Sequence, residues 1–128
     1  MSIWRFLDYV EPGSGRAPYW EWESGLPDDV QAFIDVRILA MAAMLRWPEK
    51  WASKYQGTDK IIELRCTHKK VQYRPLGAYQ PNRVFVLLGG GVEKDDQIPR
   101  GIIQAVVQRQ QTLEAHPTYV RRHRFHQG

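Results

Sequence analysis

Apolar residues recur every three or four positions from residue 30 onward, which is the period of one buried helix face. Pro27 suits the first turn of such a helix, and Asp28 and Asp29 suit the positive end of its dipole. Trp47-Pro48 should end it, because proline disfavours helical backbone in the preceding residue. The pattern therefore predicts a helix whose buried face is formed by Val30, Phe33, Ile34, Ile38, Met41, Met44 and Leu45.

The C-terminal third shows the same spacing. A helix is predicted from Arg100 to the stop at His116-Pro117, with its apolar face at Ile102, Ile103, Val106, Val107 and Leu113. Residues 2–10 have strand composition, and the residues that follow, 11–18, are rich in Pro and Gly and are predicted to form a loop. The aromatic-rich residues 19–29 run into the first helix.

Three more strands are predicted at about residues 60–67, 70–76 and 83–89. The last of them is almost continuously apolar, as expected for a central strand. Residues 77–82 (GAYQPN) contain turn-forming residues and should join the last two strands as a loop. Residues 49–59 are predicted to be either a short helix or a loop.

The stretch IIELRCTHKKVQYRPL, residues 61–76, carries one arginine in each of two alternating runs. A two-residue turn at His68-Lys69 would place Arg65 and Arg74 on one face, as diagonal neighbours. A longer loop of the same parity keeps these faces, which are Ile62, Leu64, Cys66, Val71 and Tyr73 on one side and Glu63, Arg65, Thr67, Lys70, Gln72 and Arg74 on the other. The arginine face is either solvated, with a Glu63–Arg74 ion pair, or a phosphate-binding surface, since guanidinium groups bind such anions in bidentate fashion.

Composition fits a single domain, because 128 residues that are 43% apolar can build one core. The longest apolar run, residues 38–45, is far below the roughly 20 residues that a membrane span needs. The start of the chain is too charged for a secretory signal, so a cytoplasmic protein without membrane contact is expected. The single cysteine, Cys66, excludes an internal disulfide and lies on the apolar face, where a core thiol is expected.

Charge is distributed unevenly. Residues 1–59 carry six Lys/Arg and nine Asp/Glu, whereas residues 60–128 carry twelve and five. This asymmetry favours a polyanionic or acidic partner for the second half, although a solvated basic surface would give the same count. The four histidines show no metal-ligand spacing, so no metal is predicted. Four tryptophans lie beside expected helix ends, where packing is favoured over base stacking: Trp20, Trp22, Trp47 and Trp51.

Several short motifs follow one another in a fixed order: IIELR, YR, the apolar VFVLLGG, VEK with a proline five residues after the lysine, and the closing AVVQRQQ. Through them the chain resembles the RelE/ParE toxin superfamily, closest to its phage-derived HigB-like branch, over roughly residues 3–115. The resemblance implies one RelE-like domain over residues 1–128, with an α+β fold. In this fold, N-terminal helices pack on a small twisted, mainly antiparallel sheet, and a C-terminal helix follows.

The resemblance also implies the toxin of a type II toxin–antitoxin system, bound by a cognate antitoxin. Such toxins are typically ribosome-dependent endoribonucleases that cut mRNA without metal or cofactor. The 2′-hydroxyl attacks the adjacent phosphate, which requires a base, stabilisation of the developing charge and an acid. Alternatives are a non-catalytic RelE-like binding protein, a gyrase-directed toxin, or a phage-derived structural domain with no RNA role.

Site residues follow from the same resemblance. Arg65 and Arg74 match the strand arginines that brace the phosphate, and Lys94 matches a charge-stabilising or proton-handling lysine. The base or acid near the C-terminus is left open among Tyr119, His116 and His123. Further RNA contacts are expected from Lys69, Lys70, Arg121 and Arg122.

Two departures from the family pattern stand out. The segment GGGVEKDD adds Glu93, Asp95 and Asp96 around Lys94, which weakens attraction for phosphate. Its glycines are no nucleotide-binding loop, because no Gly-Lys-Ser/Thr follows them. The basic residues 117–128 run past the usual end, either as an RNA- or ribosome-contacting tail or as a disordered end.

Overall fold

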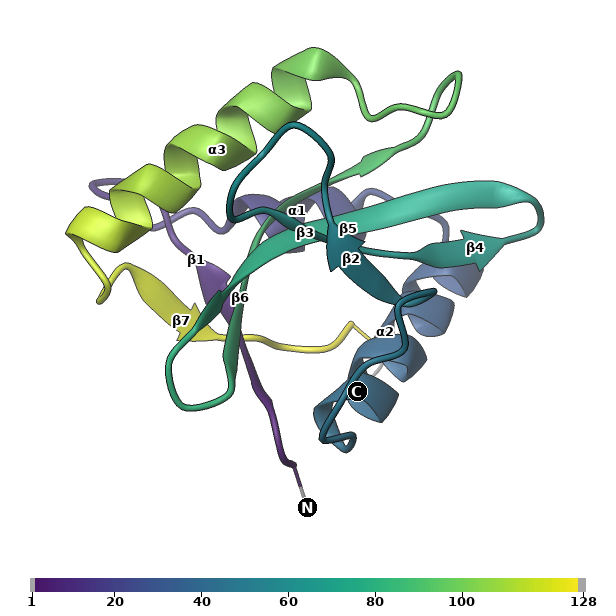
Figure 1. Ribbon diagram of the computed structural model, residues 1–128, viewed down its shortest axis with the longest axis horizontal. Helices are drawn as coiled ribbons and strands as arrows, with labels where there is room; N and C mark the ends of the chain where they lie inside the picture. The colour runs from purple at the N-terminus through teal and green to yellow at the C-terminus, as the bar shows by residue number, and fades with distance from the viewer. Residues whose placement is uncertain (1, 127–128) are drawn as a thin grey trace.

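The computed structural model describes residues 2–126, which form three helices and a seven-stranded mixed sheet (Figure 1). The α+β architecture expected from the sequence is confirmed. In chain order the elements are β1 (Arg5–Tyr9), α1 (Pro18–Ser24), α2 (Asp28–Ala42), β2 (Ala52–Lys54), β3 (Ile62–Leu64), β4 (Cys66–His68), β5 (Val71–Gln80), β6 (Val84–Val92), α3 (Arg100–Ala115) and β7 (Val120–Arg122).

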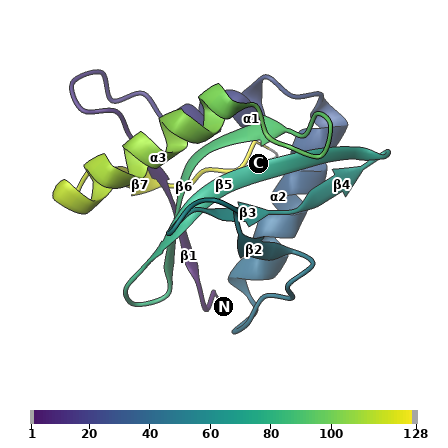
Figure 2. The same ribbon diagram turned by 45° about the horizontal axis from the view of Figure 1, so that its top comes forward.

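The strands lie in the order β2-β3-β5-β6-β1-β7, and β4 continues alongside β5 beyond the end of β3. Strands β1 and β6 pair in parallel, and the remaining pairs are antiparallel. Helices α1 and α2 supply one core on one face of the sheet, and α3 supplies a second core on the other face. Figures 1 and 2 show α2 and α3 on opposite sides of the strands.

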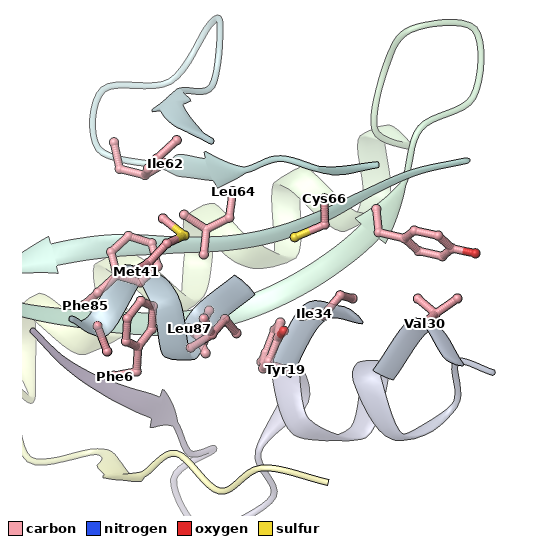
Figure 3. Packing of buried hydrophobic residues seen from close by; sticks show 14 residues of the cluster. Phe6, Tyr19, Val30, Ile34, Met41, Ile62, Leu64, Cys66, Phe85 and Leu87 are labelled. Atoms are coloured by element: carbon pink, nitrogen blue, oxygen red, sulfur yellow. The ribbon is translucent and has the colours of Figure 1, made fainter. Parts of the chain in front are cut away.

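The core beneath α2 uses most of the predicted helix face. Val30, Ile34, Ile38 and Met41 are buried, and Figure 3 shows side chains of α2 beside Leu64 and Cys66 of the sheet. Leu45, predicted to belong to this face, is exposed instead. The helix ends at Ala42, so the last residues of the predicted pattern lie beyond its apolar stripe.

Four other sequence predictions, all of element boundaries or element types, were incomplete or wrong. Residues 18–24 form α1, with Pro18 at the first helical position, where its missing N–H is not needed. Residues 52–54 form β2 rather than a helix or loop. Residues 60–67 are divided between β3 and β4. The expected loop at residues 77–82 is mostly strand, because β5 continues to Gln80.

The β4–β5 hairpin turns one residue later than predicted, at Lys69-Lys70 rather than His68-Lys69. Both lysines have positive φ (50° and 68°), as a two-residue turn with the twist of a hairpin requires. Cys66 pairs with Tyr73 and Thr67 with Gln72. This register has the parity of the predicted one, so the assignment of side chains to the two faces is kept.

The basic C-terminal segment is not a disordered end over its described length. Val120–Arg122 form β7, which pairs antiparallel with β1, and the following His123 is buried. Residues 117–119 lead from α3 into this strand. The remainder of the predicted tail, residues 127–128, lies outside the described residues.

The three consecutive glycines belong to β6, where they allow close packing on both faces. A Cβ on Gly90 would lie 2.1 Å from the Trp22 ring of α1, and one on Gly89 would lie 2.8 Å from the Arg109 guanidinium of α3. Arg109 uses this space to donate a hydrogen bond to the Leu88 carbonyl at 2.9 Å. The glycines are therefore a packing device between two helices.

We expect Gly90→Ala to lower the free energy of unfolding by about 1–3 kcal/mol, because the added methyl overlaps the Trp22 ring. Gly101→Ala is the matched control: its Cβ meets open space in α3, and alanine should stabilise the helix by up to about 1 kcal/mol. Urea unfolding of both variants measures the difference. Equal stability of the two would contradict the packing role.

Candidate functional site

Arg65 and Arg74 do face a common partner, the carboxylate of Glu63. Arg65 donates from Nε to Glu63 Oε1 at 3.0 Å, and Arg74 Nε lies 3.9 Å from Glu63 Oε2. Arg74 Nη2 also lies 2.9 Å from Glu93 Oε2. We refer to Glu63, Arg65, Arg74 and Glu93 as the arginine–glutamate cluster. Its two guanidinium groups and two carboxylates form one charge-balanced chain.

The register of the strands explains why Arg65 and Arg74 lie on either side of the same carboxylate. Glu63 pairs with Leu76 and Cys66 with Tyr73, so the same register, continued between them, puts Arg65 across from Arg74. Pro75 has no N–H to donate, which fits the interruption between β3 and β4. The Arg65 backbone bonds instead to the Trp51 carbonyl, and its own carbonyl accepts from Arg37 Nη1 at 2.7 Å.

Burial separates the two arginines. The Arg74 side chain is only 7% exposed, and it also donates to Gln72 Oε1 and to the Tyr73 carbonyl. A buried guanidinium needs such partners, because an uncompensated buried charge is costly. The Arg65 side chain is 43% exposed. Arg65 can reach a ligand from solvent, whereas Arg74 mainly holds the two glutamates.

A hollow of about 710 Å³ opens beside this cluster. Its lining includes Lys54 and Arg65, together with Glu49, Glu63, Glu93 and Asp96. Lys94 follows Glu93 in the chain and is exposed, and its backbone forms a short bridge with Gln97 that turns through Asp95 and Asp96, both with positive φ. Carboxylates outnumber cationic side chains in this lining, which limits the attraction for a phosphate.

The predicted catalytic residues do not all gather at this hollow. Tyr119 stacks on His116, with ring centroids 4.9 Å apart, beyond the C-terminal end of α3. Lys94 lies before its N-terminal end, and a helix of 16 residues is about 24 Å long. His123 is buried on the α1–α2 face, where its Nδ1 lies 2.8 Å from Asp8 Oδ1. The structure thus brings together Arg65 and Arg74 and places Lys94 next to Glu93 in the chain, but it brings neither Tyr119 nor His123 to this hollow.

The predicted RNA contacts fall into two groups. Lys69 and Lys70 are exposed at the tip of the β4–β5 hairpin, and Lys69 lies 3.2 Å from Asp29. Arg121 and Arg122 belong to β7 at the opposite edge of the sheet. Arg121 is turned towards Asp8, at 3.8 Å, and Arg122 is exposed.

Sequence reasoning missed a second polar cluster, formed by Glu23, Asp35 and His126 beneath α1 and α2. Burial, and next the neighbouring Asp35, raise the pKa of Glu23 to about 9. The three side chains are far apart in the sequence. The one available signal was the i, i+3 spacing of His123 and His126, which indicates nothing about their carboxylate partners.

Comparison with known proteins identifies one family. Residues 21–111 match the family model described as "Phage derived protein Gp49-like (DUF891)". No curated protein and no solved structure matches the chain. The matched segment contains the arginine–glutamate cluster and both turn lysines, but ends before β7. Within residues 2–126 no helix has the length and apolar character to cross a membrane.

We expect Arg74→Met to lower the free energy of unfolding by about 3–5 kcal/mol, because it removes a buried cation, leaves Glu93 without its ion-pair partner and leaves the buried Glu63 with Arg65 alone. Arg65→Met, the matched control, should cost no more than about 1 kcal/mol, since its ion pair is partly exposed. Chemical denaturation gives both values. A cost at Arg65 equal to that at Arg74 would contradict the assigned difference in burial.

Cys66 is a core thiol, as predicted: it is fully buried, and burial raises its pKa to about 12. At about pH 8, where an ordinary thiol is partly ionised, we expect a disulfide reagent to label it at least about 100-fold more slowly in the native protein than in urea. Fast native labelling would show that the core beneath α2 opens readily.

Proposed function

Because the chain belongs to the Gp49-like, phage-derived family (DUF891), which is associated with RelE- and HigB-like toxins, we propose that it is the toxin of a type II toxin–antitoxin pair and cleaves mRNA in the cytoplasm, on the translating ribosome. The observation that carries this proposal is the arginine–glutamate cluster at an open hollow, with the exposed Lys94 next to Glu93 in the chain. A cognate antitoxin would neutralise the protein.

Arg65 is the phosphate-binding group of this proposal. Glu63 Oε1 lies 3.0 Å from both Nε and Nη2 of Arg65, so the partly exposed guanidinium keeps its outward-facing Nη donors for a phosphate. Lys94 adds a second positive charge from an exposed position. The charge that develops on the phosphate oxygens is stabilised by these two side chains.

The base of this proposal is Glu93. Its side chain is 18% exposed, lines the hollow and is oriented by Arg74 at 2.9 Å. Glu63 is less suitable, because it is more buried and is shared by both arginines. The 2′-hydroxyl gives its proton to Glu93, its oxygen forms the new bond to phosphorus, and the bond to the 5′-oxygen breaks. Lys94 protonates that oxygen, and the products are a 2′,3′-cyclic phosphate and a 5′-hydroxyl.

This assignment leaves out Tyr119, His116 and His123, which lie at the far end of α3 or inside the opposite core. Lys69 and Lys70 would contact the RNA backbone from the hairpin tip, where salt-dependent phosphate contacts give affinity without sequence preference. Arg121 and Arg122 would require a second, separate RNA contact at the other edge of the sheet.

A non-catalytic binding protein is the second candidate, and one observation favours it. Each guanidinium of the cluster already has a carboxylate partner, and Glu49 and Asp96 add further negative charge to the hollow. Such a surface fits a protein partner with paired charges better than a bare phosphate. A gyrase-directed toxin would belong to this class.

The test is induced expression in bacteria, with mRNA 5′ ends mapped in translating cells. We expect the wild-type chain to stop growth and create new 5′ ends within reading frames. Arg65→Ala and Glu93→Gln should abolish these ends while remaining folded, because each replaces a partly exposed side chain. Arg46→Ala, at an exposed position after α2, is the matched control and should stay toxic.

Growth arrest without new ends would reject RNA cleavage and favour the binding protein. New ends that persist in both variants would reject this hollow as the site. If Tyr119→Phe alone removed the ends, the catalytic centre would lie at the C-terminal end of α3.

A further inference from the structure

The buried cluster of Glu23, Asp35 and His126 has the form of a cation site. Glu23 lies in α1, Asp35 in α2 and His126 in the segment after β7. Glu23 Oε2, Asp35 Oδ1 and His126 Nδ1 approach one another: Nδ1 lies 2.8 Å from Oε2 and 4.0 Å from Oδ1. One potential ligand atom of each residue lies within 4.8 Å of the others. All three side chains are buried, and His126 is the most accessible at 8%.

Each of these three side chains also makes a hydrogen bond through its second polar atom, on the side away from the cluster. Tyr19 donates its hydroxyl to Glu23 Oε1 at 2.6 Å. The His126 backbone N–H donates to Asp35 Oδ2 at 3.0 Å, and Ser24 Oγ lies 2.7 Å from His126 Nε2. Outer hydrogen bonds of this kind orient metal ligands in proteins. With these hydrogen bonds in place, Glu23 Oε2, Asp35 Oδ1 and His126 Nδ1 lie on the side of each residue that faces the other two.

The serine contact fixes the protonated nitrogen of His126. Ser24 Oγ donates its own proton to the Trp20 carbonyl at 2.6 Å, so it accepts one from His126 Nε2. Nδ1 of the neutral ring then has a lone pair directed at Glu23 Oε2. Among the described residues, no hydrogen bond of acceptable geometry satisfies Nδ1. A lone pair and a carboxylate at this separation repel each other unless a positive charge lies between them.

Charge balance favours a divalent cation over a single proton. With both carboxyl groups ionised and the imidazole neutral, the cluster carries two negative charges. A divalent cation would balance both, whereas one shared proton would leave a net negative charge in the core, where it is costly. Mixed carboxylate and imidazole donors suit first-row divalent metals, with Zn²⁺ prominent among them.

We propose that Glu23 Oε2, Asp35 Oδ1 and His126 Nδ1 bind a divalent transition-metal cation that fastens the C-terminal segment to α1 and α2. Tetrahedral zinc bonds of about 2.0–2.2 Å place the ligand atoms roughly 3.3–3.6 Å from one another. Zinc binding would therefore move His126 Nδ1 and Glu23 Oε2 slightly apart and bring Nδ1 and Asp35 Oδ1 slightly closer. The site lies on the opposite face of the sheet from the arginine–glutamate cluster, so its role is structural. His126 lies outside residues 21–111, which match the family model.

The test uses the full chain, freed of metal with a chelator and titrated with Zn²⁺ by calorimetry. We expect one Zn²⁺ per chain and a rise in the thermal unfolding midpoint. Glu23→Gln and His126→Gln should bind at least about 100-fold more weakly, and Ser24→Ala, which acts through the His126 ring, about tenfold more weakly. Matched controls are Glu21→Gln, an exposed neighbour in α1, and His68→Gln, whose partner Asp29 is exposed; both should bind as the wild type does.

A second readout follows the C-terminal segment. Zn²⁺ should slow trypsin cleavage after Arg124 in the wild type and leave the rate in His126→Gln unchanged. No binding by the wild type, or full binding by both Glu23→Gln and His126→Gln, would overturn the proposal, and a protonated His126–Glu23 ion pair would replace it. Circular dichroism checks folding. If Glu23→Gln does not fold, His126→Gln and Ser24→Ala decide.

Discussion

The simultaneous approach of α1 and α3 to opposite faces of β6 is the constraint on which the rest of this structure depends. Strand β6 is buried on both sides, and its glycines admit Trp22 from one helix and Arg109 from the other. A side chain at either position would push a helix away from the sheet. The two cores, and the polar clusters at their margins, are positioned by this thin central strand.

The arginine–glutamate cluster and the cluster of Glu23, Asp35 and His126 compensate their buried charges with different partners. On the α3 face, guanidinium groups and carboxylates alternate and neutralise one another. On the α1–α2 face, carboxylates face imidazoles: His123 Nδ1 lies 2.8 Å from Asp8 Oδ1, and His126 Nδ1 lies 2.8 Å from Glu23 Oε2. Ion pairs such as those of the arginine–glutamate cluster remain balanced when they are partly open to solvent, whereas fully buried charges depend on partners inside the core. This difference fits the open hollow beside one cluster and the closed core around the other.

Much of the fold could be predicted because its signals are local. The three-and-four spacing of Ile34, Ile38 and Met41 identified a helix face, and parity alone placed Arg65 and Arg74 on one side of the sheet. A one-residue error in the turn did not matter, since the true register preserves that parity. Helix α1 was missed because it is short and its seven residues carry no complete apolar period.

The candidate site could be predicted only in part, for a related reason. Arg65 and Glu63 are neighbours in sequence, so their contact could be anticipated. Tyr119 and His123 were assigned to the same chemistry from their position near the end of the chain, and that position does not determine where they lie. His123 meets Asp8 across 115 positions, and no local pattern contains such a contact.

The pairing of β7 with β1 also bears on how the protein is made. On a ribosome, β1 emerges first, but its two neighbours, β6 and β7, emerge only after most of the chain has been synthesised. Until then the side chains of β1 have no native partners in the sheet. Contacts between residues so far apart in the sequence also form slowly. The native sheet is therefore completed only after β7 has been synthesised, and until then β1 lacks its second neighbour.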